Sequence, residues 1–433
     1  MTEVPIPLSA KQRYMWREIA GNPGVPCRTI VAHYTVAGPL DLDRLQAALC
    51  MVVGHHEQLR LRTTGSVNAP VGMLRTPPEM LPLSVVDLSG LDEPLAEYLV
   101  AMHCERHTAT YLDLGTQWAV RALVLSRSPN RHLLLLSVHH LAADGWGAGL
   151  VGHHLEHAYR TGDLSGIPVS LPYTDYIKAE ASALDSAQSA ADLRWWEESL
   201  RTVRPAALLG SAPRPGRTLN VIEFDEAMPA PFHSDLRRLA RPVRASNYVA
   251  ALALLAAALW HRTRVGQRVL MVSHLGPRLP GYEHTVGVFS NRLPLVIRVE
   301  PDQAVADVVR TVQAGLLDLL EHSSTPFFKL PKLVPDPRVL NAQFSVQHVP
   351  PGMAGPAAPD ATFRFRRYQI SASILPVHLL LMEEPDGRMG WHCEFRSDVF
   401  RCAEGMSLIR ELLADMVTLA GDETRPIVKL LGS

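Results

Sequence analysis

Apolar side chains recur along the chain with two periods, which together predict an alternation of helices and strands. Recurrence every three or four residues is typical of an amphipathic helix, and alternation or a short apolar run is typical of a strand. The helical pattern covers 9–20, 40–60, 146–160, 249–260, 305–322 and 403–421, and a polar helical stretch contains 192–200. The strand pattern covers 28–38, 117–126, 131–140, 218–227, 267–275 and 286–300, with two more strands after the Pro- and Gly-rich loop 350–361. The turn residues RSPN at 127–130 predict a hairpin.

The length of the chain predicts two lobes, because 433 residues exceed what a single hydrophobic core usually organises. The segment TGDLSGIPVSLP (161–172) is rich in Gly, Ser and Pro and is the best candidate boundary. We therefore place an N-terminal lobe at 1–165 and a C-terminal lobe at 166–433. Both parts mix helices with predominantly β cores, so the predicted fold class is α/β or α+β.

Composition narrows the class of protein. The formal net charge is −1, which indicates neither a nucleic-acid partner nor an anionic membrane surface. The five cysteines are odd in number, scattered and never in a CxxC pair, which favours free thiols over disulfides or zinc. The N-terminus lacks the basic head and apolar core of a signal peptide, and the apolar run 249–260 is too short to cross a bilayer. We expect a soluble cytoplasmic protein with a buried helix at 249–260.

Candidate chemistry is concentrated where an apolar strand ends in HHLAADG (139–145). Successive side chains of a strand face opposite sides, so one of His139 and His140 faces a cavity and the other faces the body of the protein. Asp144 lies where the chain turns into the next helix, and Gly145 permits a tight conformation there. The structural alternative is a helix N-cap with two satisfied core histidines. Because the whole set must be accommodated at the end of a buried strand, we favour a functional site.

This stretch resembles the HHxxxDG motif of the condensation domains of nonribosomal peptide synthetases, relatives of chloramphenicol acetyltransferase. Other blocks similar to those of the family follow in the same order along nearly the whole chain. They are LSAKQRYMW (8–16), GPLDLDRLQAAL (38–49) with GHHEQLRLRT (54–63), LPYTDYIKAE (171–180), RWWEESL (194–200), HLGPR (274–278), VGVFSNRLPLVIR (286–298), EHSSTPFFKL (321–330) and EFRSDVF (394–400).

The resemblance implies two chloramphenicol-acetyltransferase-like lobes arranged as a V, with HHxxxDG midway along a tunnel between them. Donor and acceptor carrier proteins would feed phosphopantetheine arms into opposite mouths of the tunnel. One arm would carry an acyl thioester, and the nucleophile, usually an amine, would enter from the other side or as a small molecule. The resemblance thus implies a monomer that binds no cofactor or metal of its own.

By position in the motif, the resemblance makes His140 the ring that faces the tunnel, as a general base or as a partner orienting the nucleophile. An imidazole suits either task because its pKa lies near neutrality. His139 is expected to be structural. The resemblance also implies that Asp144 pairs with Arg278 of HLGPR, and such a pairing is physically reasonable because an unpartnered buried carboxylate is costly. Gly145 is expected to keep the tunnel open.

The remaining blocks are expected to be mostly scaffolding. Asn291 and Trp146 are candidates for the tunnel lining, and for Asn291 a satisfied buried amide is an equal alternative. Packing is the expected role of four further residues of these blocks, Gln12, Trp16, Tyr176 and Trp196.

Three short motifs compete with this interpretation. His153, Glu156 and His157 have the HxxEH spacing of some zinc peptidases, but no distal acidic ligand stands out, and solvated side chains are expected. The glycines of GWGAG do not complete GxGxxG, because position 150 is Leu. The basic run RFRRYQ (364–369) is expected to be a solvated edge, with contact to an acidic carrier protein as the alternative.

Three departures from the family pattern bear on specificity. Arg292 replaces the usual Thr after Asn291, Phe328 replaces Glu, and Pro376-Val377-His378 replaces Phe-Asp-Leu. None touches HHxxxDG. They therefore concern which substrates are accepted, and the block at 286–298 fits condensation domains better than epimerisation domains.

Two classes of function follow. The first is a free-standing condensation enzyme that forms an amide or ester from a carrier-bound acyl thioester, with an O-acyltransferase using acyl-CoA or an acyl carrier protein as a neighbouring alternative. The second is a non-catalytic module that recruits a partner protein. Such relatives typically lose part of the motif, whereas His140, Asp144, Gly145 and Arg278 are all present.

Overall fold

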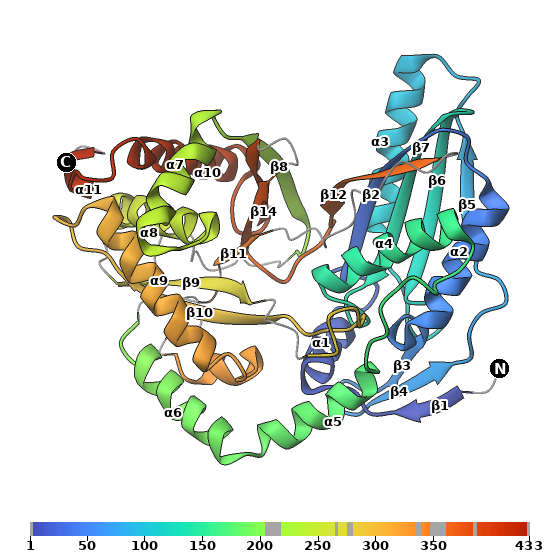
Figure 1. Ribbon diagram of the computed structural model, residues 1–433, viewed down its shortest axis with the longest axis horizontal. Coiled ribbons are helices and arrows are strands. Elements are labelled where there is room, and N and C mark those ends of the chain that lie inside the picture. The colour runs from blue at the N-terminus through green and yellow to red at the C-terminus, as the bar shows by residue number, and fades with distance from the viewer. Residues whose placement is uncertain are drawn as a thin grey trace. The chain divides into compact units, whose positions relative to one another are not determined.

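The computed structural model describes residues 3–203, 218–264, 267–274, 280–334, 336, 340, 342–346, 361–383 and 388–430. The chain forms two compact units, and each unit is assembled from three segments of the sequence. The first unit comprises 1–182, 277–289 and 348–372, and the second comprises 183–276, 290–347 and 373–433. Both mix helices with β-sheets, as the sequence predicts (Figure 1).

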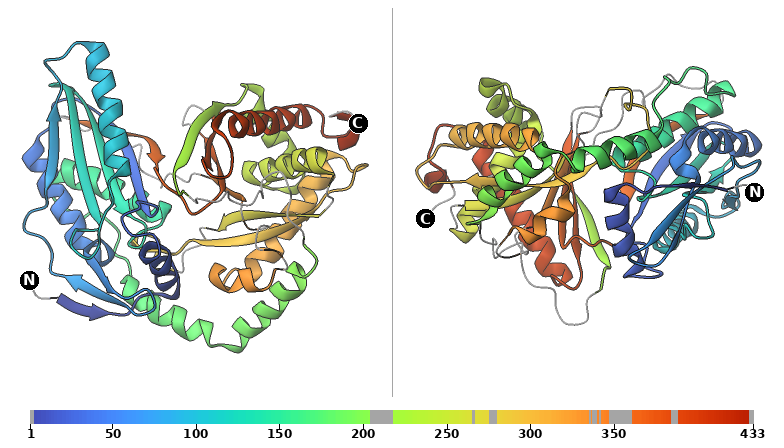
Figure 2. Two further views of the ribbon diagram at one scale, coloured as in Figure 1. Left: turned by 180° about the vertical axis from the view of Figure 1, so that it is seen from behind. Right: turned by 90° about the horizontal axis from the view of Figure 1, so that it is seen from below.

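The first unit is built on a five-stranded sheet whose strand order is β12-β2-β7-β6-β5. Its strands are β2 (Thr29–Ala37), β5 (Leu83–Asp87), β6 (Val120–Ser128), β7 (Arg131–His139) and β12 (Thr362–Gln369). The helices are α2 (Leu42–His55), α3 (Glu93–Ala109) and α4 (Gly145–Thr161). Helices α2 and α4 share one hydrophobic core with the sheet, and α3 covers the opposite face, as Figure 2 shows from behind.

A small sheet flanks this framework, with the order β1-β4-β3. It consists of β1 (Glu3–Ile6), β3 (Leu61–Gly65) and β4 (Pro70–Arg75), and is accompanied by α1 (Ala10–Ala20) and the 3-10 helix η1 (Glu57–Arg60). Helix α1 begins with a capping box, in which Ser9 and Gln12 each accept a backbone N–H of the other.

The second unit contains a six-stranded sheet with the order β10-β9-β11-β13-β14-β8. Its strands are β8 (Val221–Ala227), β9 (Gln267–His274), β10 (Asn291–Arg298), β11 (Ala342–Val346), β13 (Val377–Glu383) and β14 (Met389–Arg396). The helices are α6 (Ala187–Leu200), α7 (Pro231–Ala240), α8 (Asn247–Thr263), α9 (Val305–Glu321) and α10 (Cys402–Ala420), with short η2 (Arg241–Val243), η3 (Phe327–Lys332) and α11 (Ile427–Leu430). One large core joins α7, α8, α9 and α10 to one face of the sheet (Figure 1).

Helix α8 lies at the centre of this core. Ser246 caps its first turn, and every residue from 249 to 260 is buried, which confirms the buried helix predicted there. Within the described ranges, no single helix is long and apolar enough to span a membrane. One pair, α7 with η2 followed by α8, has the required length and composition together but is bent by 101°.

The structure confirms most predicted elements, including the β6–β7 hairpin, and corrects two. Only 291–298 of the stretch 286–300 is a strand, and 286–290 is irregular. Three strands, β12, β13 and β14, follow the loop 350–361 instead of two. Of that loop, only Ala361 lies among the described residues.

The boundary between the units differs from the predicted 165/166 and lies at 182/183. Helix α5 (Tyr173–Leu184) belongs largely to the first unit because its polar groups bond there. The Tyr173 hydroxyl donates to the Val288 carbonyl at 2.9 Å, and the Ala10 N–H donates to Glu180 at 2.8 Å. Sequence composition marks the start of the connection at 161–172 but does not show where α5 packs.

Candidate active site

The HHLAADG loop begins where β7 ends, and neighbouring backbone holds its first residues. The His139 N–H donates to the Ala119 carbonyl at 2.9 Å, and the His140 N–H donates to the Arg28 carbonyl at 2.6 Å. The Ala142 N–H then turns back to the His139 carbonyl at 2.8 Å. The pairing of β7 with β6 and with β2 therefore extends to His139 and His140, and the chain turns back immediately afterwards. These bonds fix the Cα position of His140.

The two histidines of the loop differ in burial and in bonding. His139 is buried, and its Nδ1 accepts the Leu141 N–H at 3.0 Å. Burial, with smaller contributions from His140 and Arg28, lowers the pKa of His139 to about 3, so the ring is neutral at physiological pH. His139 is thereby committed to the shape of the loop. His140, the next residue, is half-buried.

Asp144 braces the loop from its other end and is 1% exposed. One carboxylate oxygen, Oδ1, accepts the Gly147 N–H at 2.8 Å and caps α4. The other, Oδ2, accepts the Phe289 N–H at 3.0 Å, and the Asp144 N–H donates to the Gly287 carbonyl at 3.0 Å. The N-cap alternative and the bracing role therefore hold together. Arg278, its predicted partner, lies outside the described residues, so that pairing stays a prediction.

Gln12 holds the middle of the loop. It is fully buried, its Oε1 accepts the Ser9 N–H at 2.9 Å, and its Nε2 donates to the Leu141 carbonyl at 2.8 Å and to Gln58 at 2.8 Å. A residue expected only to pack thus ties the capping box of α1 to the HHLAADG loop. The SxxQ spacing predicts the cap, but nothing local indicates the bond to Leu141.

Lys11 is a contributor that the sequence did not indicate. Its ammonium donates to the Phe289 carbonyl at 2.7 Å and to the Tyr176 hydroxyl at 3.2 Å. Asp144 bonds the N–H of the same Phe289, so the two side chains hold both polar groups of one backbone residue. Burial lowers the pKa of Lys11, and the negative charges of Glu180 and Asp144 oppose that shift.

Two glycines near the loop have contrasting surroundings. A Cβ at Gly287 would lie 2.2 Å from the ring of Tyr173, so only glycine fits the segment that bonds Asp144. A Cβ at Gly145 would meet no atom of the described residues within 4 Å. Within the described ranges, nothing therefore fills the space beside Gly145 in the first turn of α4.

The two predicted lining residues lie in different units. The Trp146 indole donates to the Glu283 carbonyl at 3.2 Å, and its ring packs against the core of the first unit. Asn291, in the second unit, is buried, and both polar atoms of its amide are hydrogen-bonded. Its Nδ2 donates to two backbone carbonyls at 3.0 and 2.7 Å, and its Oδ1 accepts the Phe327 N–H at 3.0 Å. That is the satisfied amide of our alternative, and the lining role stays a prediction for both residues.

The other scaffold residues are placed as follows. The Trp16 indole donates to the Ser66 carbonyl at 3.0 Å, and Trp196 is buried with its indole donating to the His322 carbonyl at 3.1 Å. On α4, His153 and His157 are half-buried, whereas His154 between them is buried. No group of three His, Cys, Asp or Glu side chains in the described part of the chain is arranged to hold a metal ion.

Residues 3–429 match the condensation domain family. The chain is 27% identical, over 75% of its length, to the phosphinothricin tripeptide synthetase PhsC of Streptomyces viridochromogenes, and 26% identical, over 98% of its length, to the isonitrile lipopeptide synthase of Mycobacterium tuberculosis. It spans 30% and 18% of the length of these two relatives.

Solved structures share the fold. The first condensation domain of the calcium-dependent antibiotic synthetase, bound to a substrate analogue, is 23% identical with a TM-score of 0.85 and covers 98% of this chain and 99% of its own. SgcC5 of Streptomyces globisporus is 20% identical with a TM-score of 0.82, covering 97% and 100%. The X-domain from teicoplanin biosynthesis is 21% identical with a TM-score of 0.80, covering 98% and 96%. At these identities, the likeness concerns the fold alone.

Proposed function

This chain belongs to the condensation domain family, and we propose that it is an acyltransferase that joins an amine or hydroxyl nucleophile to an acyl group held as a carrier-bound thioester. The observation that carries the proposal is that the residues in and around the HHLAADG loop have different roles. His139, Asp144 and Gln12 are committed to holding the loop, and the half-buried His140 is the ring they position.

His140 is the proposed proton acceptor. A thioester is already activated, so the protein chiefly has to align the nucleophile and manage its proton. The nucleophile attacks the carbonyl carbon, the C–S bond breaks, and the proton taken up by the imidazole is delivered to the departing thiolate. The products are an amide or ester and a free thiol. The backbone on both sides of His140 is hydrogen-bonded and holds its Cα in place, which supports this proposed role.

The partners proposed are donor and acceptor carrier proteins whose phosphopantetheine arms deliver the reactants, with no cofactor resident in the chain. The two relatives named above are a tripeptide synthetase and a lipopeptide synthase, which supports a peptide-type product and an amide bond. The route by which the arms reach His140 through a tunnel stays a prediction from the family resemblance.

Mass spectrometry of acyl transfer tests the proposal. The protein is mixed with acyl-loaded carrier protein and a panel of amines and alcohols, and His140→Ala is compared with wild type. His132→Ala is the matched control, because His132 lies on the same strand but bonds Ser126 and Pro129. Product formed by wild type and His132→Ala, and lost in His140→Ala, is the expected result. A folded protein that binds the carrier but yields no product with any nucleophile would instead favour a recruitment module.

A further inference from the structure

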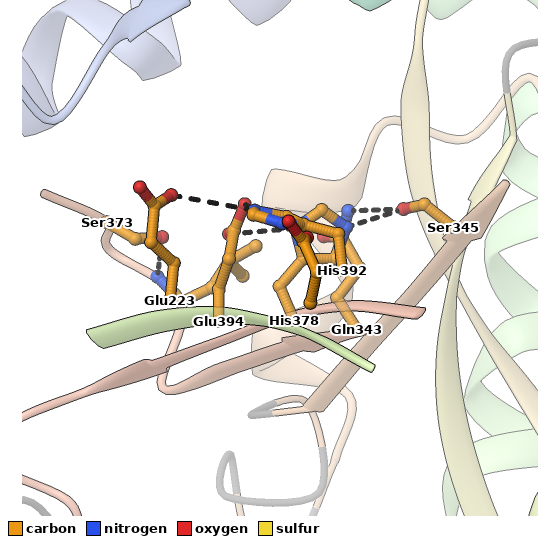
Figure 3. Close-up of polar contacts among 9 residues, drawn as sticks. Glu223, Gln343, Ser345, Ser373, His378, His392 and Glu394 are labelled. Atoms are coloured by element: carbon orange, nitrogen blue, oxygen red, sulfur yellow. Dashed lines mark hydrogen bonds and ion pairs between the residues drawn. The ribbon is translucent and has the colours of Figure 1, made fainter. Parts of the chain in front are cut away.

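The face of the six-stranded sheet that does not pack on α7 to α10 carries a row of largely buried polar side chains in the second unit (Figure 3). The strand register places Gln343 beside His378, His378 beside Glu394, and Glu394 beside Glu223. Their sequence neighbours point the other way, into the core shared with α7 to α10. The polar row is therefore a continuous feature of one sheet face rather than a set of isolated side chains.

Two members of this row, His378 and Glu394, form a relay of hydrogen bonds with Ser345, which lies two residues after Gln343 on β11. Glu394 Oε2 lies 3.1 Å from His378 Nδ1, and His378 Nε2 lies 2.9 Å from Ser345 Oγ. A carboxylate on one ring nitrogen and a hydroxyl on the other is the arrangement by which acyl-transfer enzymes activate a serine. Both distances are within hydrogen-bonding reach without any rearrangement.

The charge of Glu394 limits which atoms can donate hydrogen bonds in this relay. Burial opposes the charge of Glu394, but His378 and His392 outweigh it and lower the pKa of Glu394 to about 2, so the carboxylate can only accept hydrogen bonds. His378 must then carry its proton on Nδ1. When the ring is neutral, Nε2 is therefore the acceptor to which Ser345 can donate its hydroxyl proton.

His392 keeps the carboxylate charged. It lies 3.3 Å from Glu394 and 2.7 Å from Asp225, and it is 5% exposed at its side chain. Burial would lower the pKa of His392, but its carboxylate neighbours Asp225, Glu223 and Glu394 together raise it to about 11. The imidazolium of His392 thus stays paired with Glu394 through the neutral pH range.

Ser345 also has a side-chain donor beside it. The Gln343 amide, two residues earlier on β11, donates to Ser345 Oγ at 3.2 Å. Ser345 therefore accepts a hydrogen bond from Gln343 and can donate one to the neutral ring of His378. A donor at this position can also serve the oxygen of an acyl group that attaches to Oγ. The His378 side chain is 17% exposed, whereas Ser345 is 6% exposed.

We propose that Ser345, His378 and Glu394 form a second acyl-transfer centre that hydrolyses activated acyl groups, thioesters above all. Ser345 Oγ attacks the acyl carbon, its proton passes to His378 Nε2 and on to the departing thiolate, and an acyl ester forms on Ser345. Water then attacks that ester, giving its proton to His378, which returns it to Oγ as the acid leaves. The net reaction converts a thioester and water into an acid and a thiol. This activity is separate from the amide or ester formation proposed for His140.

Labelling with a fluorophosphonate, which reacts with activated serines, tests the centre. Intact-protein mass spectrometry is expected to show one adduct, and peptide mapping is expected to place it on Ser345. Ser345→Ala removes the adduct, and His378→Gln slows its formation about a hundredfold, the low end of what a general base supplies. Ser373→Ala is the matched control, because Ser373 is also buried in this region but bonds the Leu375 N–H. Circular dichroism of each variant separates loss of labelling from loss of fold.

Hydrolysis of a simple acyl thioester supplies the second readout. Free thiol is expected from wild type and from His140→Ala, and not from Ser345→Ala or His378→Gln. Absence of an adduct on Ser345 in the folded wild-type protein, or an adduct that forms equally fast in His378→Gln, would overturn the proposal. The row would then be a hydrogen-bonded ladder that only stabilises the sheet. Either result leaves the acyl-transfer test of His140 unaffected.

Discussion

Buried histidines of the two units lie in opposite electrostatic surroundings. In the first unit, His139 bonds a backbone N–H, and His154 bonds His56, with 2.8 Å between the ring nitrogens. Neither partner carries negative charge. Burial therefore dominates, and it lowers the pKa of both His139 and His154 to about 3, so both rings are neutral.

In the second unit, His392 is about as buried as His139, yet its pKa moves in the opposite direction. The carboxylates of Asp225, Glu223 and Glu394 surround it and outweigh the cost of burial. The comparison shows that burial alone does not set the charge of a histidine, because the partners decide whether the charged form is favoured. The two buried rings of the first unit are neutral, whereas His392 of the second unit is held in its charged form by ion pairs.

The largest expected effect is an opposite pH dependence of the two units. Because His139 and His154 have folded pKa values below the unfolded value of about 6.5, their contribution to stability is complete above pH 6.5 and is lost as the pH falls toward 3. His392 has a raised folded pKa, so its contribution is complete below pH 6.5 and is lost as the pH rises toward 11. Glu394 has a lowered folded pKa of about 2, so its contribution to stability is lost only as the pH falls below about 4.3.

Hydrogen exchange measured by mass spectrometry, corrected for intrinsic rates, checks this unit by unit. Protection is expected to fall first in the first unit between pH 6.5 and 5, and first in the second unit above pH 8. His392→Asn is the control that should remove only the alkaline loss. Loss of hydrogen-exchange protection in both units at the same pH would contradict the opposite pKa shifts of the histidines in the two units.

The second largest effect concerns whether Asp144 braces its loop by hydrogen bonds or by charge. Asp144→Ala leaves the N–H groups of Gly147 and Phe289 without their acceptor and is expected to cost about 3 kcal/mol. Asp144→Asn keeps one accepting oxygen and is expected to cost about half as much. Urea denaturation of both variants measures the difference. If Asn is as destabilising as Ala, the charge of Asp144 matters more than its hydrogen bonds.

A smaller effect is expected for Lys11→Met, which removes the bond to the Phe289 carbonyl. The loop should shift, and the rate of acyl transfer should fall about tenfold with KM for the carrier unchanged, because the reacting groups are misaligned. Lys11→Arg is expected to recover most of the rate. Lys178→Met, at an exposed lysine of α5, is the control. A rise in KM without a fall in kcat would place Lys11 in carrier binding instead.

The smallest effect is expected for Gly145→Ala. Its new methyl group meets no atom of the described residues, so the free energy of unfolding should change by less than about 0.5 kcal/mol. Gly287→Ala, which would drive a methyl group into Tyr173, should cost about 1–3 kcal/mol. Thermal unfolding of the pair compares them. A large loss for Gly145→Ala would show that the space beside Gly145 is filled.

Local signals account for the parts of the fold that the sequence predicted. RSPN marks the β6–β7 turn, Ser246 caps α8, and the motif residues at 139–145 mark the loop. Helix α3 was missed because apolar side chains occur on its exposed side as well, at Leu95 and Tyr98, which erases the helical period. Strands β1, β3, β4, β5 and β11 are only four to six residues long, too short for a clear alternation.

The supports of the candidate site were missed because they are distant in sequence. Gln12 lies 129 residues from Leu141, and Lys11 lies 278 residues from Phe289. His378 was noticed only as a departure from the family pattern. Its relation to Ser345 and Glu394 depends on which strands pair and in what register, which periodicity along one chain does not contain.

Because each unit is assembled from separate segments of the sequence, residues that contact one another are synthesised at different times. The acceptor of the Phe289 N–H, Asp144, leaves the ribosome 145 residues before its partner. At roughly 5–20 residues per second, that interval lasts on the order of 7–30 s. Strand β12, the last strand of the first sheet, is made later still, after most of the second unit. The loop that carries His140 is thus completed late, after much of the nascent chain has already emerged.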